Sequence, residues 1–350
     1  MARIRTVERS IGLPVFSSTI RGRMVSPVAG PNSSPAAVPA ANSQSLPLRH
    51  IAAKASQATS LNLQRRRRKS AGGYPRGVTS IQGPVRGVFP NSMAFAKWGS
   101  GPKTFLLLPG GPGNEVPDGF GLKMMLRPFR LIVDSGFTLW MVTRRCNMAH
   151  GHTIEDMARD YSQLIETEFD GMVDIVLGTS YGGIIAQYLA ANHPDCFRHM
   201  VIAGAAYGVS DAGKDIDYGF AENLSQGKRT EAGTFMVTGL LPKLRFRWLA
   251  RSVGFFAGRL GSGRHEYFRS DVLIEGDAEV AFDSREVLPT ISVPVLLIAG
   301  DRDVYFPLDL VEETARLIPD CRLRIYEGKG HIGAMSDKRL PKDVLEFVSQ

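Results

Sequence analysis

A serine between two glycines stands at the junction of an apolar run and a helical run. A G-x-S-x-G motif directly follows the apolar segment 173–177 and consists of Gly178, Thr179, Ser180, Tyr181 and Gly182. A strand that turns sharply into a helix at such a serine projects the hydroxyl above the sheet, and small neighbours relieve the crowding of the turn. The context therefore indicates a nucleophilic Ser180. The alternative is a glycine-rich turn in which the serine is incidental.

A serine hydroxyl needs a general base within hydrogen-bond reach and a third group that holds this base. His331 lies in a glycine-flanked loop after the last expected strand. Asp301 and Asp303 follow an expected strand over 293–299, at the sheet edge where ligands bind in parallel sheets. We assign Asp303 to the histidine because it extends past the turn, and we assign Asp301 to capping of the loop. These residues predict a nucleophile, a base and an orienting acid.

Acyl transfer also needs two backbone N–H groups aimed at the developing oxyanion. A turn rich in glycine and proline follows the apolar run 105–108 and consists of Pro109, Gly110, Gly111, Pro112 and Gly113. Proline has no N–H, so Gly111 is the better donor in this turn. The N–H of Tyr181 is the expected second donor, and a turn of purely structural purpose is the alternative.

Four segments together give the chain a family resemblance. They are PGGPG at 109–113, GTSYGG at 178–183, GDRD at 300–303 and GKGHIG at 328–333. In this order and spacing, residues 79–350 resemble the α/β-hydrolase superfamily, particularly cap-bearing esterases, carbon–carbon hydrolases and proline iminopeptidase-like members. The chain order of serine, aspartate and histidine is that of the α/β-hydrolase arrangement. The resemblance implies catalytic roles for Ser180, Asp303 and His331, and an oxyanion hole formed by Gly111 and Tyr181.

The expected function is that of a serine hydrolase acting by acyl transfer, without cofactor or metal, on a carboxylic ester of a small to medium apolar substrate. A serine at 180 argues against epoxide hydrolases and haloalkane dehalogenases, which use an aspartate nucleophile. Carbon–carbon bond hydrolase, thioesterase and aminopeptidase activities stay open, as does a ligand-binding or signalling protein with little turnover. Family members often have His-Gly where this chain has Pro109-Gly110, so the hydrogen bonds of that histidine must be absent or replaced.

Short apolar runs alternate with amphipathic stretches from residue 79 onward, which is typical of an α/β fold with a mostly parallel central sheet flanked by helices. The expected strands span 105–108, 137–143, 173–177, 200–203, 293–299 and 323–326, and their continuous apolar character suits burial on both faces. Helices are expected from a capping box at Thr153 to about Glu168, from just after Leu177 to Asn192, and over 308–317. No central strand is evident over about 207–288, where we expect a helical cap inserted into the hydrolase domain.

The positive charge of the chain is concentrated at its beginning. Residues 1–78 carry 13 Lys or Arg and one acid, Glu8, for a net of +12, whereas residues 79–350 carry 29 basic and 33 acidic residues, for a net of −4. A basic patch for nucleic acid should lie on the folded part, so no nucleic-acid partner is expected. The leader has the composition of a disordered tail or of an organelle transit peptide, and a wrongly assigned start codon would give the same pattern. The expected location is cytoplasmic, or mitochondrial or plastid if the leader is a transit peptide.

A stretch of the expected cap, residues 243–264, combines basic and aromatic side chains without an acid. One interpretation is a lid that docks on a membrane surface. We favour a cap helix whose apolar face covers a pocket for an apolar acyl or aromatic group. A small-molecule substrate is the expected partner, and the sequence leaves the oligomeric state open.

Neither cysteine nor histidine spacing predicts a metal site. Cys146, Cys196 and Cys321 are widely spaced and odd in number, so they indicate neither a disulfide framework nor a metal cluster. His150 and His152 without further ligands are typical of a loop. The sequence contains no run of about 18 apolar residues, so we predict no transmembrane helix.

Overall fold

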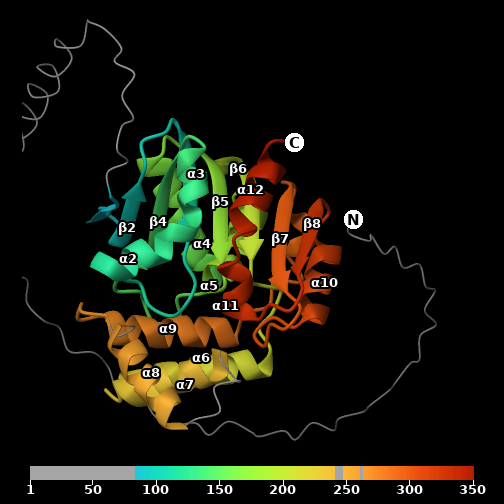
Figure 1. Ribbon diagram of the computed structural model, residues 1–350. Coiled ribbons are helices and arrows are strands. Elements are labelled where there is room, and N and C mark those ends of the chain that lie inside the picture. The colour runs from blue at the N-terminus through green and yellow to red at the C-terminus, as the bar shows by residue number, and fades with distance from the viewer. Residues whose placement is uncertain (1–82, 241–246, 261–262) are drawn as a thin grey trace, which may run out of the picture. The chain divides into compact units, whose positions relative to one another are not determined.

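An eight-stranded sheet forms the centre of the computed structural model, which describes residues 83–240, 247–260 and 263–350 (Figure 1). The strand order is β1-β2-β4-β3-β5-β6-β7-β8. The bounds are β1 (Val85–Val88), β2 (Met93–Trp98), β3 (Lys103–Leu108), β4 (Phe137–Arg145), β5 (Val173–Thr179), β6 (Phe197–Ala203), β7 (Val295–Gly300) and β8 (Cys321–Tyr326). Strand β2 pairs antiparallel with both β1 and β4, and the other neighbours pair parallel, which confirms the predicted mostly parallel α/β sheet. The leader 1–78 and the basic residues Lys243 and Arg245 lie outside the described residues.

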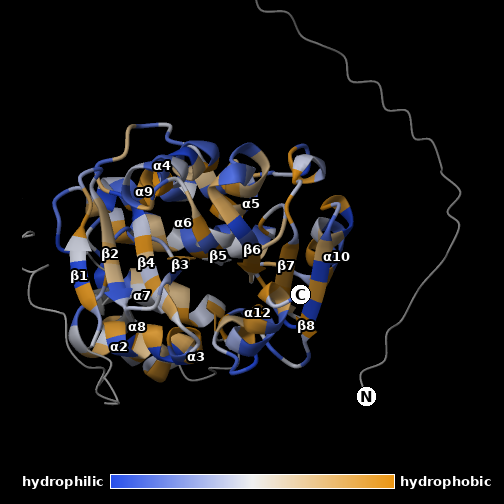
Figure 2. Ribbon diagram, turned by 90° about the horizontal axis from the view of Figure 1, so that it is seen from above, coloured by the Kyte–Doolittle hydropathy of each residue, from blue (hydrophilic) through white to orange (hydrophobic). Residues whose placement is uncertain are grey.

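Helices cover both faces of the sheet because its central strands are apolar on both sides (Figure 2). In β3, Leu106 and Leu108 pack into one core, whereas Phe105 and Leu107 pack into the other. The first face is covered by α4 (Ile154–Glu168), α5 (Tyr181–Asn192) and α10 (Leu308–Leu317). The second face is covered by α2 (Gly119–Leu126), α3 (Arg130–Asp134), α11 (His331–Met335) and α12 (Leu340–Val348). Short 3-10 turns occupy Arg127–Phe129, Pro194–Cys196 and Leu288–Thr290.

The predicted start of α4 agrees with the structure, the predicted strands differ by one to three residues at one or both ends, and the predicted start of α5 is wrong. The capping box of α4 is present, since the Thr153 hydroxyl accepts the Asp156 N–H and the Asp156 carboxylate accepts the Thr153 N–H, each at 3.1 Å. Helix α5 begins at Tyr181 and not just after Leu177. The reason is that β5 continues through Thr179, which pairs with Ala203 of β6. The whole change of direction is therefore concentrated at Ser180.

Four helices stand between β6 and β7 in the chain, where a helical insertion was predicted. These cap helices are α6 (Asp211–Ser225), α7 (Arg229–Leu240), α8 (Arg247–Leu260) and α9 (Phe268–Val280). They lie together beyond the carboxyl ends of the parallel strands, with α9 nearest the sheet (Figure 1). Phe220, Leu224, Phe268 and Val272 belong to a small core between α6 and α9, separate from the two cores of the sheet. No helix among the described residues has both the length and the apolar character needed to cross a membrane.

Candidate active site

The backbone at Ser180 adopts a conformation that residues other than glycine rarely take. Its φ is 51° and its ψ is −118°, between the end of β5 and the first residue of α5. A Cβ on Gly182 would lie 2.1 Å from the carbonyl oxygen of Leu108, so only glycine permits this close approach of helix and strand. The Ser180 N–H donates to the carbonyl of Ala203 at 2.9 Å. The surrounding structure thus holds Ser180 in a strained turn, which is the arrangement of a nucleophile elbow.

His331 lies between Ser180 and Asp303. The Ser180 Oγ is 2.9 Å from His331 Nε2, and His331 Nδ1 is 2.7 Å from Asp303 Oδ2. The histidine is the first residue of α11, and the aspartate lies in the loop after β7. The three side chains come from segments far apart in the sequence, and their elements meet at the carboxyl edge of the sheet.

The partners of Asp303 fix the tautomer of the histidine. Its second oxygen, Oδ1, accepts the backbone N–H groups of Tyr305 at 2.9 Å and Phe306 at 3.2 Å. A carboxylate with these donors can only accept, so His331 Nδ1 carries the proton. His331 Nε2 then presents a lone pair to the Ser180 hydroxyl, as a general base requires. Asp301 is exposed and does not contact the histidine.

A cavity of about 370 Å³ lies in front of Ser180 and His331. Its walls come from the loop after β3, from α2 and the 3-10 turn Arg127–Phe129, from α11 and from the cap helices α6 and α7. Most of the lining side chains are apolar, among them Leu107, Met124, Phe129, Met236, Leu240 and Met335. The cavity suits an apolar group whose reacting atom lies against the serine.

Asp217 of α6 is the acidic side chain that lines this cavity. Its Oδ1 accepts the hydroxyl of Tyr305 at 2.9 Å, and the Tyr305 ring stacks on His331 with ring centroids 4.7 Å apart. Asp217 also lies beside the buried Glu279 of α9. Burial raises the pKa of Glu279 well above its usual range, and the Asp217 carboxylate raises it further. These effects favour the protonated form of Glu279.

The predicted oxyanion donors occupy the two sides of Ser180. Gly111 has a φ of 77° and lines the cavity, and Tyr181 opens α5 directly after the serine. The N–H of Gly110 donates to Thr179 Oγ1 at 3.0 Å, so it is turned away from a bound carbonyl. The first N–H groups of a helix have no partner within the helix, which leaves the Tyr181 N–H for a ligand. Gly111 and Tyr181 therefore stay the expected oxyanion donors.

A buried arginine, which the sequence did not reveal as a site residue, holds the loop after β3. Arg144, near the end of β4, donates from Nη1 to the carbonyl of Pro109 at 2.9 Å. Its Nη2 donates to the carbonyls of Gly111 at 2.7 Å and Gly113 at 2.5 Å. These bonds hold the backbone of the loop from Pro109 to Gly113. The sequence signal that could have pointed to this role is that Arg144 directly follows the apolar run 137–143.

Glu275 of α9 compensates the charge of this arginine. Arg144 Nε lies 2.8 Å from Glu275 Oε1, and both side chains are fully buried. Burial disfavours the charged guanidinium, but Glu275 outweighs this effect and raises the pKa of Arg144. Glu275 Oε2 also accepts the Gly113 N–H at 2.5 Å, and its backbone carbonyl accepts the Tyr181 hydroxyl at 2.8 Å. The ion pair therefore joins the oxyanion loop, the start of α5 and the cap helices.

Comparison with known proteins places this architecture in a family. A model described as "Alpha/beta hydrolase family" matches residues 105–343. The chain belongs to the alpha/beta hydrolase family. It is 28% identical over 250 residues to the non-heme chloroperoxidase CPO-A1 of Kitasatospora aureofaciens, covering 63% of this chain and 86% of the relative.

Two further similarities fit this membership. The chain is 30% identical over 175 residues to a pimeloyl-[acyl-carrier protein] methyl ester esterase of Neisseria meningitidis, covering 49% of this chain and 55% of that esterase. The fold resembles that of MGS-M2, an alpha/beta hydrolase enzyme from a Medee basin deep-sea metagenome library, with a TM-score of 0.59 and 18% identity. That match covers 74% of this chain and 94% of the other.

Proposed function

We propose that this member of the alpha/beta hydrolase family is a serine hydrolase that cleaves carboxylic esters through an acyl-enzyme. The observation that carries the proposal is the hydrogen-bonded series from Ser180 Oγ through His331 to Asp303, at 2.9 and 2.7 Å. Ser180 and His331 line a largely apolar cavity, which can bind an apolar ester next to the nucleophile.

The first half-reaction acylates the serine. Ser180 Oγ attacks the ester carbonyl carbon while its proton moves to His331 Nε2, and Asp303 stabilises the resulting imidazolium. The carbonyl oxygen becomes an oxyanion that accepts the N–H groups of Gly111 and Tyr181. The tetrahedral intermediate then expels the alkoxide, which takes the proton from His331 and leaves as an alcohol.

The second half-reaction frees the enzyme. A water molecule gives a proton to His331 Nε2 and attacks the acyl carbon, which forms a second oxyanion in the same hole. The intermediate releases the carboxylic acid, and Ser180 Oγ regains the proton from the histidine. The two half-reactions together consume one ester and one water and release one alcohol and one carboxylic acid. The enzyme returns to its starting state.

One observation favours a second type of substrate. Asp217 presents a carboxyl group to a largely apolar cavity, and it accepts a hydrogen bond from Tyr305. A substrate with an N–H or ammonium group near the scissile bond would find an acceptor there. An amino-acid ester or amide is therefore the second candidate, and it uses the same serine chemistry.

The test is hydrolysis of a p-nitrophenyl ester series from acetate to long acyl chains, by the wild-type chain and its Ser180→Ala variant. We expect turnover that depends on Ser180, with an optimum at short to medium chains because the cavity is about 370 Å³. Hydrolysis of an aminoacyl p-nitroanilide under the same conditions tests the second candidate, an amino-acid ester or amide substrate. Turnover that persists in Ser180→Ala would contradict the proposal, and a folded wild-type chain without turnover would favour the ligand-binding alternative.

A further inference from the structure

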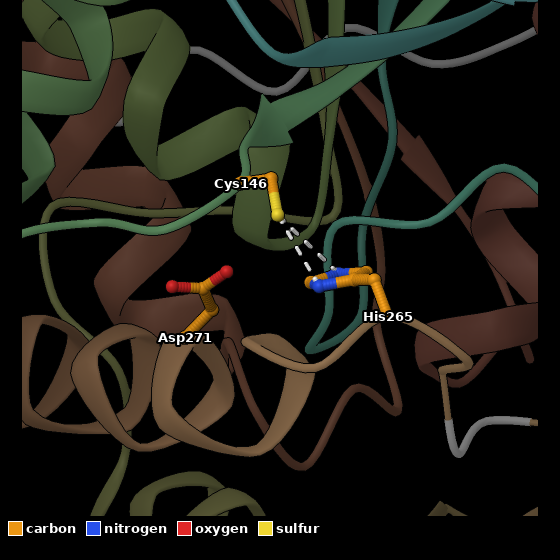
Figure 3. A group of neighbouring side chains, drawn as sticks. All are labelled: Cys146, His265 and Asp271. Carbon is orange, nitrogen blue, oxygen red and sulfur yellow. Dashed lines mark hydrogen bonds between the residues drawn. The ribbon is translucent and has the colours of Figure 1, made fainter.

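Three side chains of metal-binding type meet where the end of β4 faces the beginning of α9 (Figure 3). Cys146 follows β4, His265 precedes α9, and Asp271 lies in the first turn of α9. One ligand atom of each lies within 4.8 Å of the others. The cluster lies outside the residues that line the cavity of Ser180.

The hydrogen bonds of Asn114 fix which nitrogen of His265 is free. Asn114 Nδ2 donates to the carbonyl of Arg145 at 2.8 Å and to Asp271 Oδ2 at 2.7 Å, which uses both of its protons. Asn114 Oδ1, at 2.8 Å from His265 Nε2, must therefore accept, so Nε2 carries the proton. The lone pair of His265 Nδ1 then faces Cys146 Sγ at 3.2 Å. A histidine oriented through its distal N–H in this way is typical of metal ligands.

The carboxylate of Asp271 is also held in place. The backbone N–H groups of Asn147 and Met148 donate to its two oxygens, each at 2.9 Å. Asn147 takes a φ of 61°, a conformation that costs free energy in a residue other than glycine, and this turn brings both N–H groups to the carboxylate. With the bond from Asn114, three donors occupy a carboxylate that offers about four lone-pair sites, so one acceptor site is left for a ligand.

Carboxyl groups hold both sides of the cluster. Asp271 accepts the N–H groups of Asn147 and Met148, and Glu115 Oε1 accepts the backbone N–H of His265 at 2.9 Å. These groups favour a cation at the cluster, and a bound divalent cation deprotonates a coordinating thiol.

We propose that Cys146 Sγ, His265 Nδ1 and an Asp271 carboxylate oxygen bind a zinc-class divalent transition-metal ion. Thiolate, imidazole and carboxylate together are ligands that Zn²⁺ accepts, and tetrahedral bond lengths imply an S···N separation of about 3.5 Å, close to the 3.2 Å found here. The ion displaces the thiol proton, which leaves to solvent, and two anionic ligands balance its charge. Water completes the coordination. The ion would fasten the end of β4 to α9, beside the loop that carries Gly113 and Asn114.

The test uses the full chain, stripped of metal with a chelator and titrated with Co²⁺ and then with Zn²⁺. We expect one Co²⁺ to bind per chain with a thiolate-to-cobalt charge-transfer band, and Zn²⁺ to displace it. Cys146→Ser should lose the band and weaken binding by about tenfold or more. The matched control replaces Cys196 and Cys321 with serine and should keep the band.

Two results would overturn the proposal. One is a charge-transfer band that survives in Cys146→Ser but disappears in the Cys196 and Cys321 control. The other is a wild-type chain whose thermal midpoint does not rise with Zn²⁺, because an ion that binds the folded state must stabilise it. If Cys146→Ser does not fold, His265→Gln takes its place, and loss of affinity with a weakened cobalt spectrum is expected.

Discussion

The substitution Arg144→Met tests how the oxyanion loop is held. It removes three hydrogen bonds to the carbonyls of Pro109, Gly111 and Gly113, and it leaves Glu275 buried without its cation. Removing one partner of a buried ion pair costs about 3–5 kcal/mol of folding free energy. The domain should still fold, but with a clearly lower denaturation midpoint in urea.

The catalytic loss should exceed what instability explains. If the Gly111 N–H moves away from the oxyanion, kcat should fall by about 10²–10³, the effect of losing one oxyanion donor. KM should change little, because the donor acts mainly in the transition state. Arg144 is thus a positioning residue, and a split between kcat and KM distinguishes this role from a purely structural one.

A double variant provides the matched control. In Arg144→Met with Glu275→Met no buried charge is left unpaired, so much of the lost stability should return. The carbonyls of the loop still lack their donor, so kcat should stay low. The reasoning would be refuted by a folded Arg144→Met protein with wild-type kcat, or by a double variant that regains full activity.

Three more substitutions probe the candidate site. Asp303→Asn should keep the fold but lower kcat by roughly 10⁴, because an amide at this position favours the wrong tautomer of His331, and steady-state ester hydrolysis measures the loss. Gly111→Ala should lower kcat with a smaller loss of stability, because a Cβ at a φ of 77° strains the turn that presents the donor N–H; intact kinetics would remove Gly111 from the oxyanion hole. Glu279→Gln should flatten the pH dependence of stability. The folded wild type keeps a proton that the unfolded chain releases above about pH 4.3, so its stability is full below that pH and falls by up to about 1.4 kcal/mol per pH unit as pH rises toward the raised pKa. Urea midpoints that depend on pH equally in both proteins would contradict a protonated Glu279.

The sequence predicted the central strands and the order of the elements because each is signalled locally. Strands buried on both faces have continuous apolar runs, and α4 begins with a capping box. The strands β1 and β2 were not predicted, and β1, which forms one edge of the sheet, is largely exposed and carries no apolar run. The start of α5 was placed too early, because a sequence does not show that Thr179 still pairs with β6.

The motif spacing predicted which residues would come together at Ser180, since the carboxyl ends of parallel strands share one edge. The pair of Arg144 and Glu275 could not be predicted in this way. Its members lie 131 residues apart, and Glu275 belongs to a cap helix whose packing on the sheet depends on tertiary contacts. The cluster of Cys146, His265 and Asp271 was missed for the same reason, because Cys146 follows β4 whereas His265 and Asp271 lie before and within α9.

Covalent labelling with an active-site phosphonate tests the central claim most directly. The wild-type chain should gain one phosphonyl group, and peptide mass spectrometry should place it on Ser180. Ser180→Ala should stay unlabelled while its far-ultraviolet circular dichroism matches the wild type. Labelling of Ser180→Ala at the wild-type rate, or a wild-type adduct on another residue, would contradict the assignment of Ser180 as the nucleophile.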